Sequence, residues 1–181
     1  MITVGSTVSD RAGEIASEGN TVINLNNPCD GSGVISTAGM QFSTGDADGT
    51  GVKVALFYQT TGNYYRCRST YAIDGAVTKG SAQSKTVSLT AVKGDCIGWH
   101  CDDGQMERDT SGGSGLMWVA GDQCTVGTEV EYALLADDIA SIYGSGGWAN
   151  VTQVLDKASV NILTVNDQAA TRIGSINGKA V

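Results

Sequence analysis

The stretch that decides the fold is GVKVALFY at residues 51–58, in which every second side chain is bulky. Val52, Val54, Leu56 and Tyr58 share one parity. Because successive side chains of a strand point to opposite faces, this pattern predicts a strand with one buried face. The same alternation occurs at Val87 and Leu89, Ile97 and Trp99, Met117 and Val119, and Val130, Tyr132 and Leu134.

Clusters of Gly, Asn, Asp and Ser separate these windows and mark turns, at residues 26–33, 43–51, 60–63, 93–95, 102–104 and 110–115. Short strands with such punctuation predict an all-β fold, an antiparallel β-sandwich or jelly roll. We expect strands near residues 20–25, 33–43, 51–60, 63–73, 85–92, 95–101, 115–120, 128–135 and 138–143.

Composition agrees with one globular domain rich in turns. The chain has 181 residues, of which 41% are hydrophobic and 17% charged, with 25 glycines and one proline. The net charge of −8 is concentrated in the second half, so we expect no nucleic-acid partner. No apolar run reaches the roughly 20 residues that span a bilayer, and the first residues lack a signal-peptide pattern, so we expect neither a membrane segment nor secretion.

The pattern changes after the glycine-rich residues 144–147, and we divide the chain there into a sandwich domain, 1–147, and an extension, 148–181. A short helix or turn is expected behind Asn150. Burying an apolar side chain contributes roughly 1.5 to 3 kcal/mol, so the extension is predicted to anchor the chain on a partner or on a second copy of itself. The expected interface residues are Val151, Val154, Leu155, Val160, Ile162, Leu163, Val165, Ile173 and Ile176.

A weak internal repeat lies in the last 20 residues. Residues 165–169, VNDQA, correspond to residues 176–180, INGKA, at an offset of 11. Two copies are too few for a solenoid, which usually needs at least three.

Several motifs carry a resemblance to a known class of proteins. They are INLNNPCDGSG at 23–33, GVKVALFY at 51–58, VKGDCIGWH at 92–100, ERDTSG at 107–112, DDIASIYGSGG at 137–147 and SINGKAV at 175–181. With these motifs the chain resembles β-sandwich modules of phage and phage-like virion proteins. The resemblance implies a capsid decoration protein, a minor capsid or tail component, or a receptor-binding head, and it implies no catalytic residues.

Catalysis has little support in the residues themselves. The one histidine, His100, is next to Cys101, but neighbours in a strand point to opposite faces. Because Ile97 and Trp99 are expected to face inward, His100 is expected to face solvent. We therefore expect no enzyme, no catalytic residues and no cofactor.

Metal and nucleotide sites are also not expected. Cys96 and Cys101 lack the spacing of a zinc site, and the odd set of five cysteines predicts reduced, buried thiols rather than disulfides. The acidic residues between 95 and 138 could converge on calcium, although a solvated acidic face is the preferred interpretation. The segment Asp46 to Gly49 resembles the start of a calcium loop, but position 12 is Phe57, so we interpret it as a plain turn. The glycine clusters lack the lysine of a P-loop.

Aromatic residues offer one further candidate. Tyr64, Tyr65 and Tyr71 lie near a predicted hairpin and could stack on a sugar ring, whereas Trp99, Trp118 and Trp148 are expected in the core or at an interface. We favour a structural virion protein located in the particle, forming homo-oligomers and binding other virion proteins. The alternative is a display module that binds a host glycan or receptor.

Overall fold

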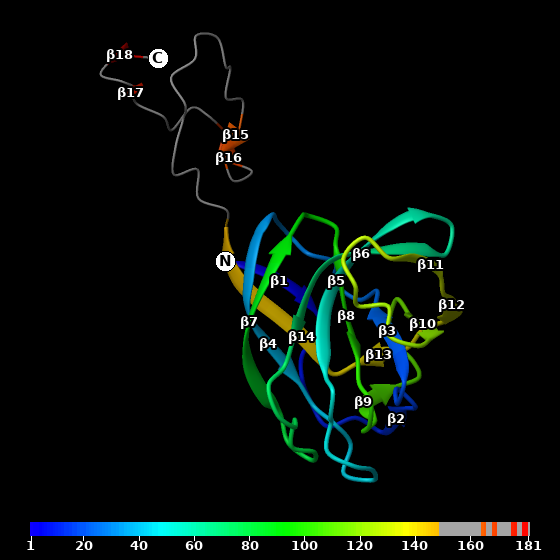
Figure 1. Cartoon of the computed structure of the whole chain (residues 1–181). Coiled ribbons are helices and arrows are strands. Elements are labelled where there is room, and N and C mark those ends of the chain that lie inside the picture. Colours follow the sequence, from blue (N-terminus) through cyan, green and yellow to red (C-terminus); the bar gives the residue numbers. More distant parts are fainter. Residues whose placement is uncertain (149–163, 166–167, 170–174, 177–178, 181) are drawn as a thin grey trace.

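The all-β fold predicted from the sequence is confirmed. The computed structural model describes residues 1–148 and four two-residue strands between 164 and 180 (Figure 1). Every strand pairing in it is antiparallel. The first fourteen strands are β1 (Ile2–Gly5), β2 (Gly13–Ile15), β3 (Asn20–Asn24), β4 (Gly33–Met40), β5 (Lys53–Thr61), β6 (Tyr64–Ala72), β7 (Gln83–Ala91), β8 (Cys96–His100), β9 (Met106–Asp109), β10 (Leu116–Ala120), β11 (Glu129–Glu131), β12 (Ala133–Leu135), β13 (Ile139–Ala140) and β14 (Ile142–Trp148).

The strands form a sandwich whose two layers enclose the main core. One layer is a seven-stranded sheet with the order β11-β6-β5-β8-β3-β10-β12. The other contains a four-stranded sheet, β1-β14-β4-β7, and a small sheet, β13-β9-β2. The largest side chains of the main core include Trp99, Phe42, Leu56 and Ile35, all fully buried. Figure 1 shows the four-stranded sheet at the left of the body and the edge strands β11 and β12 at the right.

The seven-stranded sheet curls until its two edges are neighbours in the chain. β11 and β12 are the first and last strands of the sheet, yet only Tyr132 separates them. The curl encloses a second core, which contains Ile23, Ala55, Phe57, Tyr65, Cys67, Cys96, Met117, Cys124 and Tyr132. The central strands are therefore buried on both faces.

Because the sheet curls, one of the expected strands was predicted wrongly. Residues 128–135 were expected to form a single strand, but they form β11, which pairs with β6, and β12, which pairs with β10. The chain changes partner at Tyr132, whose side chain enters the second core. Three short strands, β1, β2 and β9, were not expected from the sequence.

The internal repeat of the extension corresponds to two hairpins of the same register. β15 (Thr164–Val165) pairs with β16 (Gln168–Ala169), and β17 (Ser175–Ile176) pairs with β18 (Lys179–Ala180). In the sequence, two residues separate the strands of each pair, and in the second pair they are Asn177 and Gly178, a dipeptide that strongly predicts a hairpin. Of the expected interface residues, Val165 and Ile176 belong to these strands. The others, Val151, Val154, Leu155, Val160, Ile162, Leu163 and Ile173, and the helix expected behind Asn150 lie outside the described residues.

Candidate functional site

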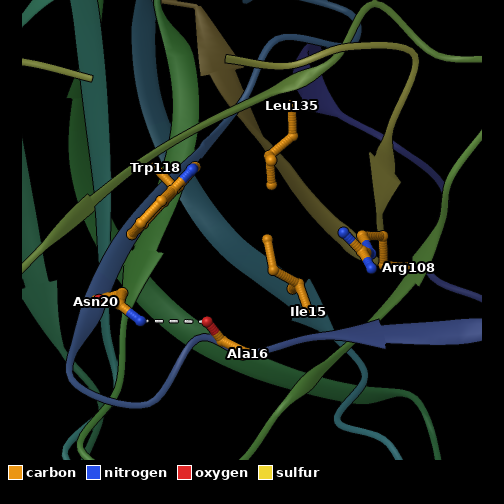
Figure 2. Close-up of a pocket in the computed structure, with 6 residues that line it drawn as sticks. All are labelled: Ile15, Ala16, Asn20, Arg108, Trp118 and Leu135. Carbon is orange, nitrogen blue, oxygen red and sulfur yellow. Dashed lines mark hydrogen bonds between the residues drawn. The ribbon is translucent and has the colours of Figure 1, made fainter. Parts of the chain in front are cut away.

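An open pocket lies between the seven-stranded sheet and the small sheet. Its volume is about 330 Å³. β3, β10 and β12 supply one wall, and β2 and β9 supply the other. Figure 2 shows the indole of Trp118 and the guanidinium of Arg108 on opposite sides of the hollow, with the side chains of Leu135 and Ile15 between them. The lining residues are Ile15, Ala16, Asn20, Arg108, Trp118 and Leu135.

Trp118 is the aromatic wall of this pocket. It has the parity of Leu116, a residue of the main core, so its side chain points to the same face of the sheet. Its partner on β12 is Ala133, which is too small to cover an indole ring, and the side chain stays 39% exposed. The expectation that the tryptophans belong to the core or to an interface therefore holds for fully buried Trp99, while Trp118 lines an open pocket.

Arg108 and Asn20 are the polar groups of the pocket. Arg108 has the parity of the core residue Met106 and points between the layers. Its Nη1 donates to Asp138 at 3.0 Å, whereas its Nε is buried and has no hydrogen-bond partner within the described chain. Asn20 donates from Nδ2 to the carbonyl of Ala16 at 3.2 Å. The pocket thus has an apolar floor with polar groups at both ends.

A second surface, which we call the hydroxyl face, is the outer side of the four-stranded sheet. Thr3, Ser145, Thr37 and Thr86 are cross-strand partners and form one row over all four strands. The hydroxyl face also contains Val34, Ser36, Ser84, Ser88, Thr90 and Tyr143. None of these side chains carries a charge at neutral pH. Asp30, at the β1 edge, accepts a hydrogen bond from the Thr3 hydroxyl at 2.9 Å, so the row is free of charge from Ser145 to Thr86.

The three tyrosines proposed as a glycan site lie in different environments. Tyr64 is 39% exposed, and its hydroxyl lies 3.3 Å from Glu131. Tyr65 is buried in the second core, where its ring lies against that of Tyr132. Tyr71 is half-buried and packs against the main core. Only Tyr64 offers an exposed ring, and the structure does not bring the three side chains together.

His100 does not face solvent, so this expectation was wrong. Its side chain is buried, with Nδ1 2.9 Å from the carbonyl oxygen of Asn20 and Nε2 3.4 Å from Asp102. The alternation along β8 was interpreted correctly, with Ile97 and Trp99 in the main core. The error arose because the curled sheet is buried on its other face as well.

All five cysteines are free and buried, as expected for reduced thiols. Burial raises the pKa of the Cys67 thiol to about 11 and that of Cys96 to about 12. Burial raises the pKa of Cys101 to about 11. A nucleophilic thiol requires a lowered pKa, so these groups are inert core residues.

One group of carboxylates converges within the described residues. Oxygens of Glu18, Asp46 and Asp103 all lie within 4.8 Å of one another. Gln105 donates to Glu18 at 2.6 Å. Asp103 belongs to the acidic residues between 95 and 138 that were considered for calcium. Asp46 belongs to the segment Asp46 to Gly49, which was interpreted as a plain turn. Acidic side chains gather in this way on many protein surfaces without binding an ion.

No protein-family model matches the chain, and no curated protein matches its sequence. The described residues contain no helix that is both long and apolar enough to cross a membrane.

Proposed function

We propose that this protein is a non-catalytic structural subunit of a phage-type particle, and that copies of it associate through the hydroxyl face. The observation that carries the proposal is the row Thr3, Ser145, Thr37 and Thr86. This row makes an extended sheet surface of small, uncharged side chains on a strongly acidic chain.

The charge distribution favours a second copy as the occupant of this face. Two chains of net charge −8 repel each other wherever their acidic surfaces meet. Exposed carboxylates such as Asp102, Asp122 and Glu129 lie on the seven-stranded sheet or in the loops beside it, in the opposite layer. The hydroxyl row offers a surface on which two copies can meet without burying an unpaired charge, which is the costliest kind of desolvation.

The chemistry of the face also fits a close contact between sheets. Hydroxyl groups can donate and accept, so a row of them can bond to the same row of a second copy related by a two-fold axis. Small side chains allow two sheets to approach closely. β7 forms the edge of this sheet, and the hydroxyl face includes four of its nine residues, Ser84, Thr86, Ser88 and Thr90.

The assignment to a particle comes from the resemblance to phage virion modules, and the apolar residues of the extension support it. In this proposal the hydroxyl face joins copies, and the extension attaches them to other virion proteins. The glycan-binding alternative involved Tyr64, Tyr65 and Tyr71, which lie on β6 of the seven-stranded sheet and not on the hydroxyl face.

Light scattering on the full chain tests the association. The wild type should have a multiple of the monomer mass of 18.6 kDa, and the double variant Thr37→Glu/Thr86→Glu should have the monomer mass. Thr110→Glu/Thr125→Glu, which places the same charges on exposed loop residues, should keep the wild-type mass. A monomeric wild type at high concentration, or an unchanged mass for Thr37→Glu/Thr86→Glu, would overturn the proposal.

A further inference from the structure

We propose that the pocket beside Trp118 binds one neutral pyranose ring of a glycan. This inference is independent of the association through the hydroxyl face. It depends on the geometry of the pocket, on an exposed indole and on a partly exposed guanidinium at the opposite end.

The indole supplies the surface on which a sugar ring can stack. Trp118 is 39% exposed, although tryptophan residues are highly buried on average. An amphipathic ligand with an apolar face and a polar rim matches a wall of this kind. A pyranose has such a shape, because its C–H groups form one face and its hydroxyl groups lie around the ring. Ile15 and Leu135 extend the apolar surface between Trp118 and Arg108 (Figure 2).

The polar end of the pocket is suited to hydroxyl groups. The Arg108 side chain is 25% exposed, and its Nη1 forms an ion pair with Asp138. Its Nε–H has no acceptor within the described chain but is buried beneath the pocket surface, so a ligand can reach only the rest of the guanidinium. A sugar hydroxyl is both donor and acceptor, so it can bond to the guanidinium while other hydroxyls reach the Asn20 amide at the far side.

The charges favour a neutral ligand over an anion. Asp138 already neutralises Arg108, and its side chain is 7% exposed, so this carboxylate stays beside the guanidinium. An anionic ligand would also approach a chain of net charge −8. The volume of about 330 Å³ is near the lower end of the range of roughly 300 to 1,000 Å³ for ligand pockets, which favours a single ring.

The test is a titration of the full chain with the methyl glycosides of glucose, galactose, mannose and N-acetylglucosamine, followed through the NMR signals of the indole N–H groups. At least one glycoside should shift the Trp118 signal in a saturable way and leave the signal of buried Trp99 unchanged. Trp118→Ala should weaken binding at least about tenfold. Tyr64→Ala is the matched control, because Tyr64 is also 39% exposed and lies outside the pocket, and it should bind as the wild type does.

A second variant separates binding from folding. Ala16→Phe narrows the pocket at an exposed position and removes no polar group, so it should reduce binding while the amide spectrum of the core stays unchanged. The inference is overturned if no glycoside shifts the Trp118 signal. It is equally overturned if Trp118→Ala binds normally, if Tyr64→Ala alone abolishes binding, or if only charged sugars bind.

Discussion

The ring of Tyr132 packs edge-on against the ring of Phe57, with 6.2 Å between their centroids and 72° between their planes. Tyr132 is also the single residue between the two edge strands of the seven-stranded sheet. Its side chain therefore holds the curl of the sheet closed from inside the second core.

Truncating Tyr132 should destabilise the fold strongly. We expect Tyr132→Ala to lower the free energy of unfolding by about 3 to 5 kcal/mol, as for other large aromatic core residues. The Tyr132 hydroxyl is buried without a hydrogen-bond partner in the described chain, so Tyr132→Phe should be neutral or slightly stabilising. Denaturant unfolding measures both values, and equal losses for the two variants would contradict this role of the ring.

Removing Arg68 should lower the free energy of unfolding, because it leaves the buried carboxylate of Asp95 without its ion-pair partner. Asp95 accepts from Arg68 Nε at 2.7 Å and from the N–H of Val92 at 2.8 Å, and burial raises its pKa. We expect Arg68→Leu to cost about 3 to 5 kcal/mol near neutral pH, because it leaves a buried charge without its partner. Because burial raises the pKa of Asp95, the loss should shrink as the pH is lowered and this carboxylate takes up a proton. A loss that is independent of pH would show that Arg68 acts only through packing, for example on the ring of Tyr58.

The buried thiols should make the fold sensitive to alkali. The pKa values of Cys67, Cys96 and Cys101 are raised by burial from the ordinary 9.0 to between about 11 and about 12. Above pH 9 the unfolded chain releases these protons and the native chain retains them, so the free energy of unfolding should fall as pH rises. Cys96→Ala should flatten this slope in denaturant titrations between pH 8 and pH 11. An equally steep slope in Cys96→Ala would assign the effect to other groups.

Deleting residues 149–181 should leave the sandwich intact. Among the residues whose burial the structure describes, 1–148 supply both hydrophobic cores, and Trp148 at the end of β14 packs against the main core. We expect the shortened chain to unfold within about 0.5 kcal/mol of the full chain and to lose attachment to particles in co-sedimentation. A shortened chain that is unfolded would show that the extension belongs to the domain.

The sequence predicted the strands of the sandwich better than their environment. Alternation at Val54, Leu56, Ile97 and Trp99 identified β5, β8 and their inward faces. Alternation shows that two faces differ, but it does not show whether the second face meets water. For this reason the exposure of His100 was predicted wrongly and the burial of Tyr65 was not predicted. The curl that buries both side chains depends on contacts between distant segments.

The pocket could not be predicted from the sequence by the same rules. Trp118 stays exposed beside a small cross-strand partner, Ala133. This depends on register and on the pairing of β12 with β10, which the expected single strand at 128–135 did not contain. The hydroxyl row likewise required the register of four strands from distant parts of the chain.

Chemical cross-linking tests the central claim, association through the hydroxyl face, most directly. Since all five native cysteines are buried, Thr37→Cys, Ser145→Cys and Thr86→Cys would each place one accessible thiol on the face, and Thr110→Cys would place one elsewhere. With a short bis-maleimide, at least one of the first three variants should form a covalent dimer in high yield, while Thr110→Cys stays monomeric. Monomers for all three face variants, or equal yields for Thr110→Cys, would contradict the account.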